Sequence, residues 1–389
     1  MTLSTLSTSK FEVSEKSGAQ SEQFKPNRRI FMLSFNKILR ANLALVFAVI
    51  TALTLTACSG NSGTGGEVRI QGAGATFPNP LYQKWVSEYG KQHSNVKIDY
   101  QSVGSGAGIK QIKERTIDFG ASDSPMKDED LKAASGEILH IPTVLGAVVL
   151  TYNLSGVSQP LRFAPDVVAD LYLGKIKNWN DPRLKADNPG VSFPNADITV
   201  VYRSDGSGTS AVFTDYLSKV SPEWKDKVGT GTSPKWPVGI GAKGNEGVTG
   251  QVKQTPNTIG YVELAYAVQN KLPAALIKNK SGSFVEPSID AVTAAAAGSL
   301  ATTPDDLRVS ITDAAGATAY PISSYTYILA YKAQPDQVKG KTLVDFLWWG
   351  IHDGEKFAKE LQYAPLPEEI VKRAEAKINS MTAGGQPLR

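Results

Sequence analysis

The chain has 389 residues, 41% hydrophobic and 20% charged, a composition typical of globular proteins and a length too great for one ordinary core. We therefore expect two domains. The net charge of +4 comes entirely from residues 1–57, which carry seven Lys or Arg and three Asp or Glu; residues 58–389 carry 34 of each sign. Such a neutral body lacks the basic surface that nucleic-acid binding requires.

Residues 1–57 are expected to be a secretory leader rather than folded structure. Lys37 and Arg40 precede a 17-residue uncharged apolar run (41–57) that ends in small residues, the pattern of a signal peptide, and this run is short for a membrane span. We favour Met32 as the start, in which case residues 1–31 are not translated. The alternative is that RRIFM (28–32) belongs to a twin-arginine export signal, although it stands apart from the apolar run.

Cys58 is the only cysteine, so the chain cannot form an internal disulfide. It closes the sequence LTAC (55–58), which resembles the lipobox of bacterial lipoproteins, where the cysteine becomes the lipidated first residue. The Gly/Ser-rich stretch that follows, 58–66, reads as a flexible tether and offers nothing to bury a thiol. We therefore predict an exported protein in the periplasm or at the outer cell surface, held to the membrane only by a lipid on Cys58.

From residue 67 the chain repeats a strand, a loop and a helix three times, which predicts parallel strands with crossover helices and an α/β fold. The expected elements up to residue 153 are strands 67–72, 96–103, 117–123 and 138–153 and helices 81–92, 109–116 and 124–134. The middle of the chain continues with helix 164–176, strand 197–203, helix 209–220, a strand-then-helix unit at 258–270 and helix 288–299. The last expected elements are strands 308–313 and 324–332 and helices 340–361 and 367–380.

Three turns share one design: GAGATF (72–77), GSGAG (104–108) and RSDGSGTS (203–210). Each follows an expected strand, consists largely of small residues and opens an expected helix. Helix N-termini present unpaired N–H groups to anions, glycine allows close approach, and Ser and Thr add donors. Arg203 adds a fixed charge suited to an oxyanion, and Asp205 could orient its guanidinium. Together the turns predict a single convergent anion site.

The stretch DFGASDS (118–124) places an acid beside this predicted site. A carboxylate repels an anion unless that anion carries a proton to donate, so Asp123 favours hydrogen phosphate over sulfate as the ligand. Simpler interpretations are that Asp123 caps the next helix, that the Ser/Gly turns only cap helices, and that Arg203 forms a surface ion pair with Asp205.

Enzyme motifs are weak in this chain. Phe77 stands where a dinucleotide-binding motif has its last glycine, and Gln111 stands where a phosphate loop has Ser or Thr. The sequence has no nucleophile elbow and no cluster with metal-ligand spacing, and its three histidines are isolated. His140 lies in an apolar strand, where packing in the core is the simplest role. We expect a binding protein without cofactor or metal; a phosphate-handling enzyme such as a phosphomonoesterase is the alternative.

Several long motifs resemble one family. They include GAGATFPNPLYQKW (72–85), VGSGAGIKQI (103–112), DFGASDSPM (118–126), VVYRSDGSGTSAVFTDYL (200–217) and TIGYVELAYA (258–267). From about residue 68 to the C-terminus, the chain resembles the periplasmic phosphate-binding protein of bacterial ABC phosphate importers. This resemblance implies a two-domain periplasmic-binding-protein (type II) fold with a hinge and a ligand cleft. Its domains would be 67–145 with 320–389, and 146–319.

The resemblance also implies the function and its residues. The protein would be a high-affinity receptor that closes around inorganic phosphate and delivers it to the permease and ATPase subunits of an importer; another oxyanion is the alternative ligand. Phe77 and Gly208 would contribute backbone N–H groups, and Asp205 would hold Arg203. The implied phosphate contacts are Thr76, Phe77, Ser105, Asp123, Arg203, Ser207, Gly208 and Thr209.

Overall fold

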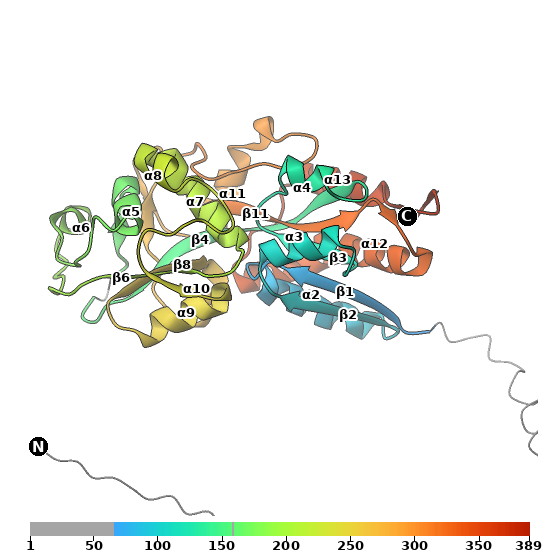
Figure 1. Ribbon diagram of the computed structural model, residues 1–389, viewed down its shortest axis with the longest axis horizontal. Helices are drawn as coiled ribbons and strands as arrows, with labels where there is room; N and C mark the ends of the chain where they lie inside the picture. Colours follow the sequence, from blue (N-terminus) through green and yellow to red (C-terminus); the bar gives the residue numbers. More distant parts are fainter. Residues whose placement is uncertain (1–65, 158) are drawn as a thin grey trace, which may run out of the picture. The chain divides into compact units, whose positions relative to one another are not determined.

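A computed structural model describes residues 66–157 and 159–389 of the chain. The predicted leader, Cys58 and nearly all of the predicted tether lie outside the described residues. The described body is mixed α/β and is built on one eight-stranded sheet with the strand order β2-β1-β3-β11-β4-β8-β6-β7 (Figure 1). Among the described helices, none combines the length and the hydropathy needed to cross a membrane.

The first strands of the chain form one end of this sheet. They are β1 (Val68–Gly74), β2 (Val96–Ser102) and β3 (Phe119–Ser122), and β1 pairs in parallel with both of the others. The connections contain α2 (Asn79–Gln92) and α3 (Ser105–Lys113). The predicted strand–helix alternation is confirmed here, and it brings the carboxyl ends of three strands to one edge.

The centre of the sheet is antiparallel, which the repeated strand–helix pattern did not predict. The 16-residue β4 (Ile138–Asn153) pairs with β11 (Ser323–Tyr331) along Ile138–Ala147 and with β8 (Thr258–Glu263) along Val148–Asn153. Fifteen of its residues are buried, which explains its nearly continuous apolar sequence. One strand therefore joins two half-sheets, with β11 also pairing antiparallel to β3.

The second half-sheet again has parallel pairs, because β6 (Thr199–Arg203) lies between β8 and β7 (Ile240–Ala242). The main helices around this half include α7 (Gly208–Val220), which follows β6, and α9 (Gly244–Gln254), which follows β7. The other helices of the body are α4 (Asp128–Lys132), α5 (Pro165–Tyr172), α6 (Pro182–Asp187), α8 (Pro222–Lys227), α10 (Leu264–Gln269), α11 (Ile289–Ala297), α12 (Gln337–Ile351) and α13 (Glu368–Asn379).

Short elements complete the described body. The 3₁₀ helices are η1 (Leu300–Thr302), η2 (Asp353–Phe357) and η3 (Lys359–Leu361). Two small sheets contain β5 (Arg162–Phe163), β9 (Leu276–Lys278) and β10 (Phe284–Val285), and β12 (Ala333–Gln334), β13 (Thr382–Ala383) and β14 (Gln386–Pro387).

Three sequence expectations need correction. The helix expected at 124–134 shrinks to α4, and the helix expected at 340–361 ends at Ile351, after which the chain continues as 3₁₀ turns. The strand expected at 308–313 is wrong, since this segment forms no strand. Its polar groups bond to side chains instead: the hydroxyls of Ser310 and Thr312 donate to Asp215 of α7. The alternation of apolar and polar residues in 308–313 therefore arises because the segment packs against α7, not because it pairs in a sheet.

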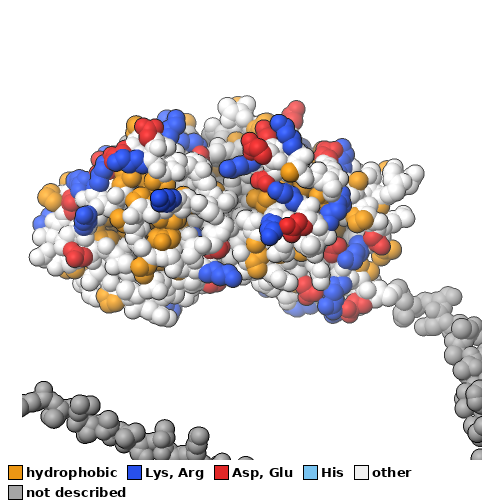
Figure 2. Space-filling view, in the orientation of Figure 1, with side chains coloured by type: hydrophobic (Ala, Val, Ile, Leu, Met, Phe, Trp, Pro, Cys, Tyr) orange, Lys and Arg blue, Asp and Glu red, His pale blue; other side chains and the backbone are white. Residues whose placement is uncertain are grey.

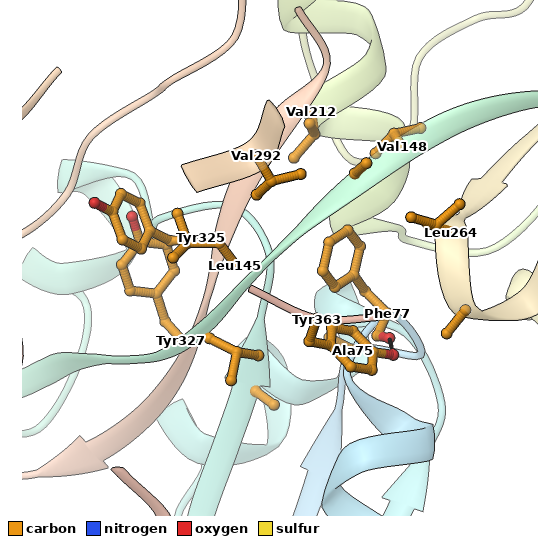
Figure 3. Close-up of a cluster of buried hydrophobic side chains, with 14 of the residues drawn as sticks. Ala75, Phe77, Leu145, Val148, Val212, Leu264, Val292, Tyr325, Tyr327 and Tyr363 are labelled. Carbon is orange, nitrogen blue, oxygen red and sulfur yellow. Dashed lines mark hydrogen bonds between the residues drawn. The ribbon is translucent and has the colours of Figure 1, made fainter. Parts of the chain in front are cut away.

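The hydrophobic core surrounds β4 and reaches the first glycine-rich turn. Figure 3 shows Leu145 and Val148 of β4 among side chains from distant parts of the chain, including Phe77 and Tyr363. Phe77 is fully buried, and the Tyr363 hydroxyl donates to its backbone oxygen at 2.6 Å. The core therefore anchors the turn that follows β1. On the face shown in Figure 2, basic and acidic side chains are interspersed, in keeping with the equal charge counts of residues 58–389.

Candidate functional site: a buried polar cluster between the half-sheets

The three predicted turns and Asp123 meet at the carboxyl ends of their strands. Thr76 follows β1, Ser105 follows β2 and Asp123 follows β3, while residues 203–210 end β6 and open α7. The start of α7 packs closely against the other turns, because a Cβ added at Gly208 would lie 2.4 Å from Ser105 Oγ and 2.7 Å from the Asp123 backbone nitrogen. The Gly106 N–H also donates to the Gly206 oxygen at 2.8 Å. The predicted convergence of the turns is thus present in the structure.

Arg203 is a buried cation held by one acid. Its side chain is 1% exposed, and it makes a two-pronged contact with Asp205, with Nε–Oδ1 at 2.8 Å and a terminal nitrogen to Oδ2 at 2.6 Å. Burial alone would raise the pKa of Asp205, but the hydrogen bonds and charge of Arg203 outweigh it and lower that pKa. The alternative of a surface ion pair is therefore wrong, because the guanidinium has left solvent.

Asp205 also contacts two further turns, those that contain Gly244 and Gly104. Its Oδ1 accepts the backbone N–H of Gly244 at 2.9 Å, at the start of α9. Gly104 packs so closely that an added Cβ would lie 2.4 Å from Asp205 Oδ2, and its φ of +96° is one that favours glycine. The carboxylate therefore holds the guanidinium and, at the same time, the loops on either side of it.

Asp123 is a buried acid in the same cluster and is 2% exposed. Its Oδ1 accepts from the Thr326 hydroxyl at 2.9 Å, and its Oδ2 accepts from the Thr209 hydroxyl at 3.4 Å. Burial raises the pKa of Asp123 to about 7, although the Thr326 hydrogen bond and the charge of Arg203 act in the opposite direction. The alternative role as a helix cap is wrong, since α4 begins at Asp128 and Lys127 precedes it.

Helix capping explains only one of the three turns. The Ser207 hydroxyl accepts the N–H of Ser210 at 3.0 Å and so caps α7. The residues before α2 and α3 are Pro78 and Gly104, and neither helix has a side-chain cap. The buried hydroxyls of Thr76 and Ser105 therefore do not cap α2 or α3. Their oxygens instead accept backbone N–H groups from other segments, Thr76 from Asn245 at 3.1 Å and Ser105 from Asp123 at 3.4 Å.

Two polar residues of this cluster were missed from the sequence. Asn245, fully buried in α9, donates from Nδ2 to the hydroxyl oxygens of Thr76 at 2.7 Å and Thr209 at 3.1 Å. The stretch GAKGNEG (241–247) is a fourth glycine-rich turn before a helix, and this pattern could have identified Asn245 from the sequence. Thr326 lies inside the apolar strand β11 and had no such signal, because its role depends on pairing between β11 and β3.

His140 makes its side-chain hydrogen bond outside this cluster. His140 is buried in β4, where its Nε2 accepts the Met126 N–H at 2.9 Å and burial lowers its pKa to about 3. Across residues 66–157 and 159–389, no group of three or more His, Cys, Asp and Glu side chains is placed to hold a metal ion. The described cluster is therefore made of one cation, two carboxyl groups, hydroxyls, an amide and backbone N–H groups.

Comparisons with known proteins place the chain in a family. Residues 59–349 match the PBP superfamily domain. The phosphate-binding protein PstS of Xylella fastidiosa (strain 9a5c) is 44% identical over 346 residues, covering 84% of this chain and 94% of that protein. This chain belongs to the PstS family of the PBP superfamily. PstS of Pasteurella multocida is 47% identical over 309 residues, covering 79% of this chain and 89% of its own length.

A solved structure supports the same fold for this PstS-family chain. The phosphate-binding protein from Stenotrophomonas maltophilia superimposes with a TM-score of 0.62 at 21% identity, covering 80% of this chain and 94% of that one. The expected α/β fold of a two-domain periplasmic binding protein is confirmed.

The raised pKa of Asp123 predicts how an amide at this position changes stability. The folded pKa of about 7 exceeds the ordinary value of 3.8, so the proton on Asp123 stabilises the fold fully below pH 3.8, and this contribution is lost as the pH rises through 7. Asp123→Asn cannot ionise and avoids that loss, which is about 1.4 kcal/mol for each unit of pKa shift. In the anion-free protein, the melting temperature of the variant relative to wild type should therefore be several degrees higher at pH 8 than at pH 5. A difference that is equal at both pH values, measured by calorimetry, would contradict the assignment.

Proposed function

We propose that this chain is a receptor that binds inorganic phosphate between its half-sheets and delivers it to an ABC importer. The observation that carries the proposal is the buried Arg203–Asp205 pair, whose guanidinium bonds to the Thr209 hydroxyl in a cluster that Asn245 extends to the Thr76 hydroxyl of the other half-sheet. A guanidinium with convergent donors suits an oxyanion, since charge-assisted hydrogen bonds are about twice as strong as neutral ones. The relatives from Xylella and Pasteurella are both phosphate-binding proteins, which supports phosphate as that anion.

The proposed phosphate contacts combine side chains with helix N-termini. Arg203 supplies the charge, and the N–H groups at the start of α7 add the partial positive charge of a helix end. Phe77, anchored by Tyr363, contributes its backbone N–H from the opposite side. The contacts that we propose are Thr76, Phe77, Ser105, Asp123, Arg203, Ser207, Gly208 and Thr209, with Asp205 in support.

Asp123 gives the proposed site its selectivity. A phosphate that carries a proton can donate to a carboxylate oxygen, whereas sulfate at neutral pH presents only acceptors to that oxygen. The unfavourable contact with sulfate lies in a buried cluster, where an unpaired or repelling polar group costs most. The raised pKa of Asp123 supports this role, because a carboxyl group that ionises near pH 7 can share a proton with a ligand that ionises in the same range.

We further propose that the body consists of two lobes, 67–145 with 320–389, and 146–319. The change of partner along β4, from β11 to β8 after Ala147, supports a hinge there. Arg308 bridges the proposed lobes, since it bonds to Asp128 at 2.7 Å and to the Met126 oxygen at 3.1 Å. A ligand held by both lobes would favour the closed arrangement over an open one, which is how such receptors respond to binding.

The proposed receptor carries its anchor upstream of the described body. The apolar run 41–57 and the LTAC sequence support export followed by lipidation of Cys58, in the periplasm or at the outer cell surface. Its partners would be the permease and ATPase subunits of the importer. The lipid would hold the receptor near those subunits while the stretch 58–66 leaves it free to turn.

We propose that the protein binds phosphate without cleaving phosphate esters. His140 and His352 support this view, because their ring nitrogens bond to Met126, Trp348 and Glu375 rather than to a serine hydroxyl. A chromogenic phosphate ester should stay intact with the pure protein. Hydrolysis that persists after Arg203 is replaced would instead favour a contaminant, and hydrolysis that disappears with it would favour an enzyme.

The central prediction concerns Arg203. A protein that comprises residues 59–389, stripped of bound anion and titrated with phosphate by calorimetry, should show one tight site. Arg203→Ala should weaken phosphate binding by at least about 100-fold, since charged hydrogen bonds contribute about 1.5–3 kcal/mol each. Arg203→Lys, which keeps the charge without the two-pronged geometry, should lose less. Arg183→Ala removes an arginine that is 41% exposed and should leave affinity unchanged.

Thermal unfolding of each arginine variant separates lost binding from lost folding. Unchanged phosphate affinity in a folded Arg203→Ala protein would remove Arg203 from the site. A wild-type protein that binds sulfate in place of phosphate would keep the anion site and overturn the identity of the ligand.

A second prediction tests selectivity at Asp123. Asp123→Asn replaces the acceptor with an amide that can donate to any oxyanion, so sulfate should compete with phosphate at least about tenfold better than in wild type. Asp118→Asn is the matched control, because Asp118 lies at the other end of β3 and bonds to Gln71 and Lys339. Competition titration at pH 8 provides the measurement. Sulfate that stays excluded from the Asp123→Asn protein would show that another group selects the ligand.

A third prediction tests the anchor. Cys58→Ser removes the only thiol that lipidation could use, so the exported protein should move from the membrane fraction to the soluble fraction. Fractionation of cells that express the wild type and the variant checks this outcome. A variant that remains with the membrane would reject anchoring through Cys58.

A further inference from the structure

We propose that Asn245 is a positioning residue that turns the hydroxyl hydrogens of Thr76 and Thr209 toward the bound anion. The proposal rests on the proposed function, since it deepens the account of the same site. Asn245 comes from α9, a helix outside the three predicted turns, and is fully buried. Its carboxamide lies between the turn after β1 and the start of α7, so it contacts both half-sheets at once.

The orientation of the Asn245 amide is set by the backbone of β8. The N–H of Glu263 donates to Asn245 Oδ1 at 3.0 Å. A backbone N–H can only donate, so the atom that faces it must be the amide oxygen. The Nδ2 group, with its two hydrogens, is therefore on the side of the threonines. The carboxamide acts as a donor to the proposed site, and it cannot reverse without placing two donors face to face.

Thr76 receives two hydrogen bonds from Asn245. Its hydroxyl oxygen accepts from Nδ2 at 2.7 Å and from the backbone N–H of Asn245 at 3.1 Å. A hydroxyl has two lone pairs and one hydrogen, so both acceptor positions of Thr76 are occupied. Among the residues that the structure describes, the Thr76 hydroxyl donates to no group. Its hydrogen is the only hydrogen-bonding capacity that it retains, and an anion oxygen is a suitable acceptor.

Thr209 is constrained in the same way by two different donors. Its hydroxyl oxygen accepts from Asn245 Nδ2 at 3.1 Å and from Arg203 at 3.4 Å. Its hydrogen is directed toward Asp123 Oδ2 at 3.4 Å, a long contact that an anion oxygen could replace. Both threonines are thus restricted to donation. A hydroxyl free to rotate could otherwise present a lone pair to the anion and repel it.

This arrangement divides the tasks of the site. Asn245 and Arg203 make the hydroxyls donors, and Asp123 supplies an acceptor for the ligand's proton. A simple packing role for Asn245 predicts something different, because a packing residue would affect binding whether or not the threonine hydroxyls are present. The two explanations can be separated by double-mutant cycles.

The test measures phosphate affinity of Asn245→Ala, Thr76→Val, Thr209→Val and the two double variants that combine Asn245→Ala with each threonine change. We expect Asn245→Ala alone to weaken binding at least about tenfold. In either valine background the same change should cost at least threefold less, since one of its two hydroxyl partners is gone. Losses that multiply independently in both backgrounds would overturn the proposal.

Asn245→Asp provides a second, isosteric test that does not create a cavity. A carboxylate accepts hydrogen bonds from the hydroxyls and draws both hydrogens away from the anion, so this variant should bind phosphate more weakly than Asn245→Ala does. Phosphate affinity equal to or better than that of Asn245→Ala would contradict the positioning role. Thr249→Val is the matched control on the same helix, because the Thr249 hydroxyl donates to the backbone oxygen of Asn245, so the change removes a hydroxyl without touching Thr76 or Thr209.

The outcomes also separate this inference from the proposed function. Wild-type protein that fails to bind phosphate would reject the proposed function itself. Wild-type protein that binds phosphate tightly, with independent losses at Asn245 and the threonines, would reject only the positioning role. Thermal unfolding of every variant confirms that the affinities refer to folded protein.

Discussion

The buried ion pair between Arg203 and Asp205 is the interaction on which the site depends. A guanidinium that is 1% exposed would be costly without a partner, and Asp205 meets it with two hydrogen bonds. The same carboxylate accepts the Gly244 N–H and lies against Gly104. Asp205 thus contacts the turn after β6, the start of α9 and the turn after β2, and it holds these three segments together.

Asp123 introduces the opposite charge into the same small volume. Thr326 and Thr209 donate to it, yet burial still raises its pKa to about 7. In the proposed site, Arg203 would attract the anion and Asp123 would accept a hydrogen bond only from a protonated one, a combination that suits a selective receptor better than a general anion trap. The proposed role of Asn245 fits this scheme, since its amide donates to the hydroxyl oxygens of Thr76 and Thr209 and would leave each hydroxyl with its hydrogen to present to the ligand.

Local sequence patterns predicted those helices and strands whose formation depends on residues close together in the sequence. The strand at 138–153 was predicted with its observed bounds, because sixteen nearly continuous apolar residues suit a strand buried on both faces. The strand expected at 308–313 failed, since Ser310 and Thr312 bond to Asp215 instead of pairing in a sheet. Antiparallel pairing of β4 was also missed, because strand direction depends on contacts between distant segments.

The sequence by itself determined the turns that carry donors, the isolated arginine with its acid two residues away, and the family to which the chain belongs. Glycine, serine and helix-start patterns are local, so they can be read without a fold. Only the tertiary structure decided that Arg203 is buried, that Thr326 faces Asp123 and that Asn245 joins two turns. These facts depend on which strands become neighbours, and burial and pKa follow from that assembly rather than from any one segment.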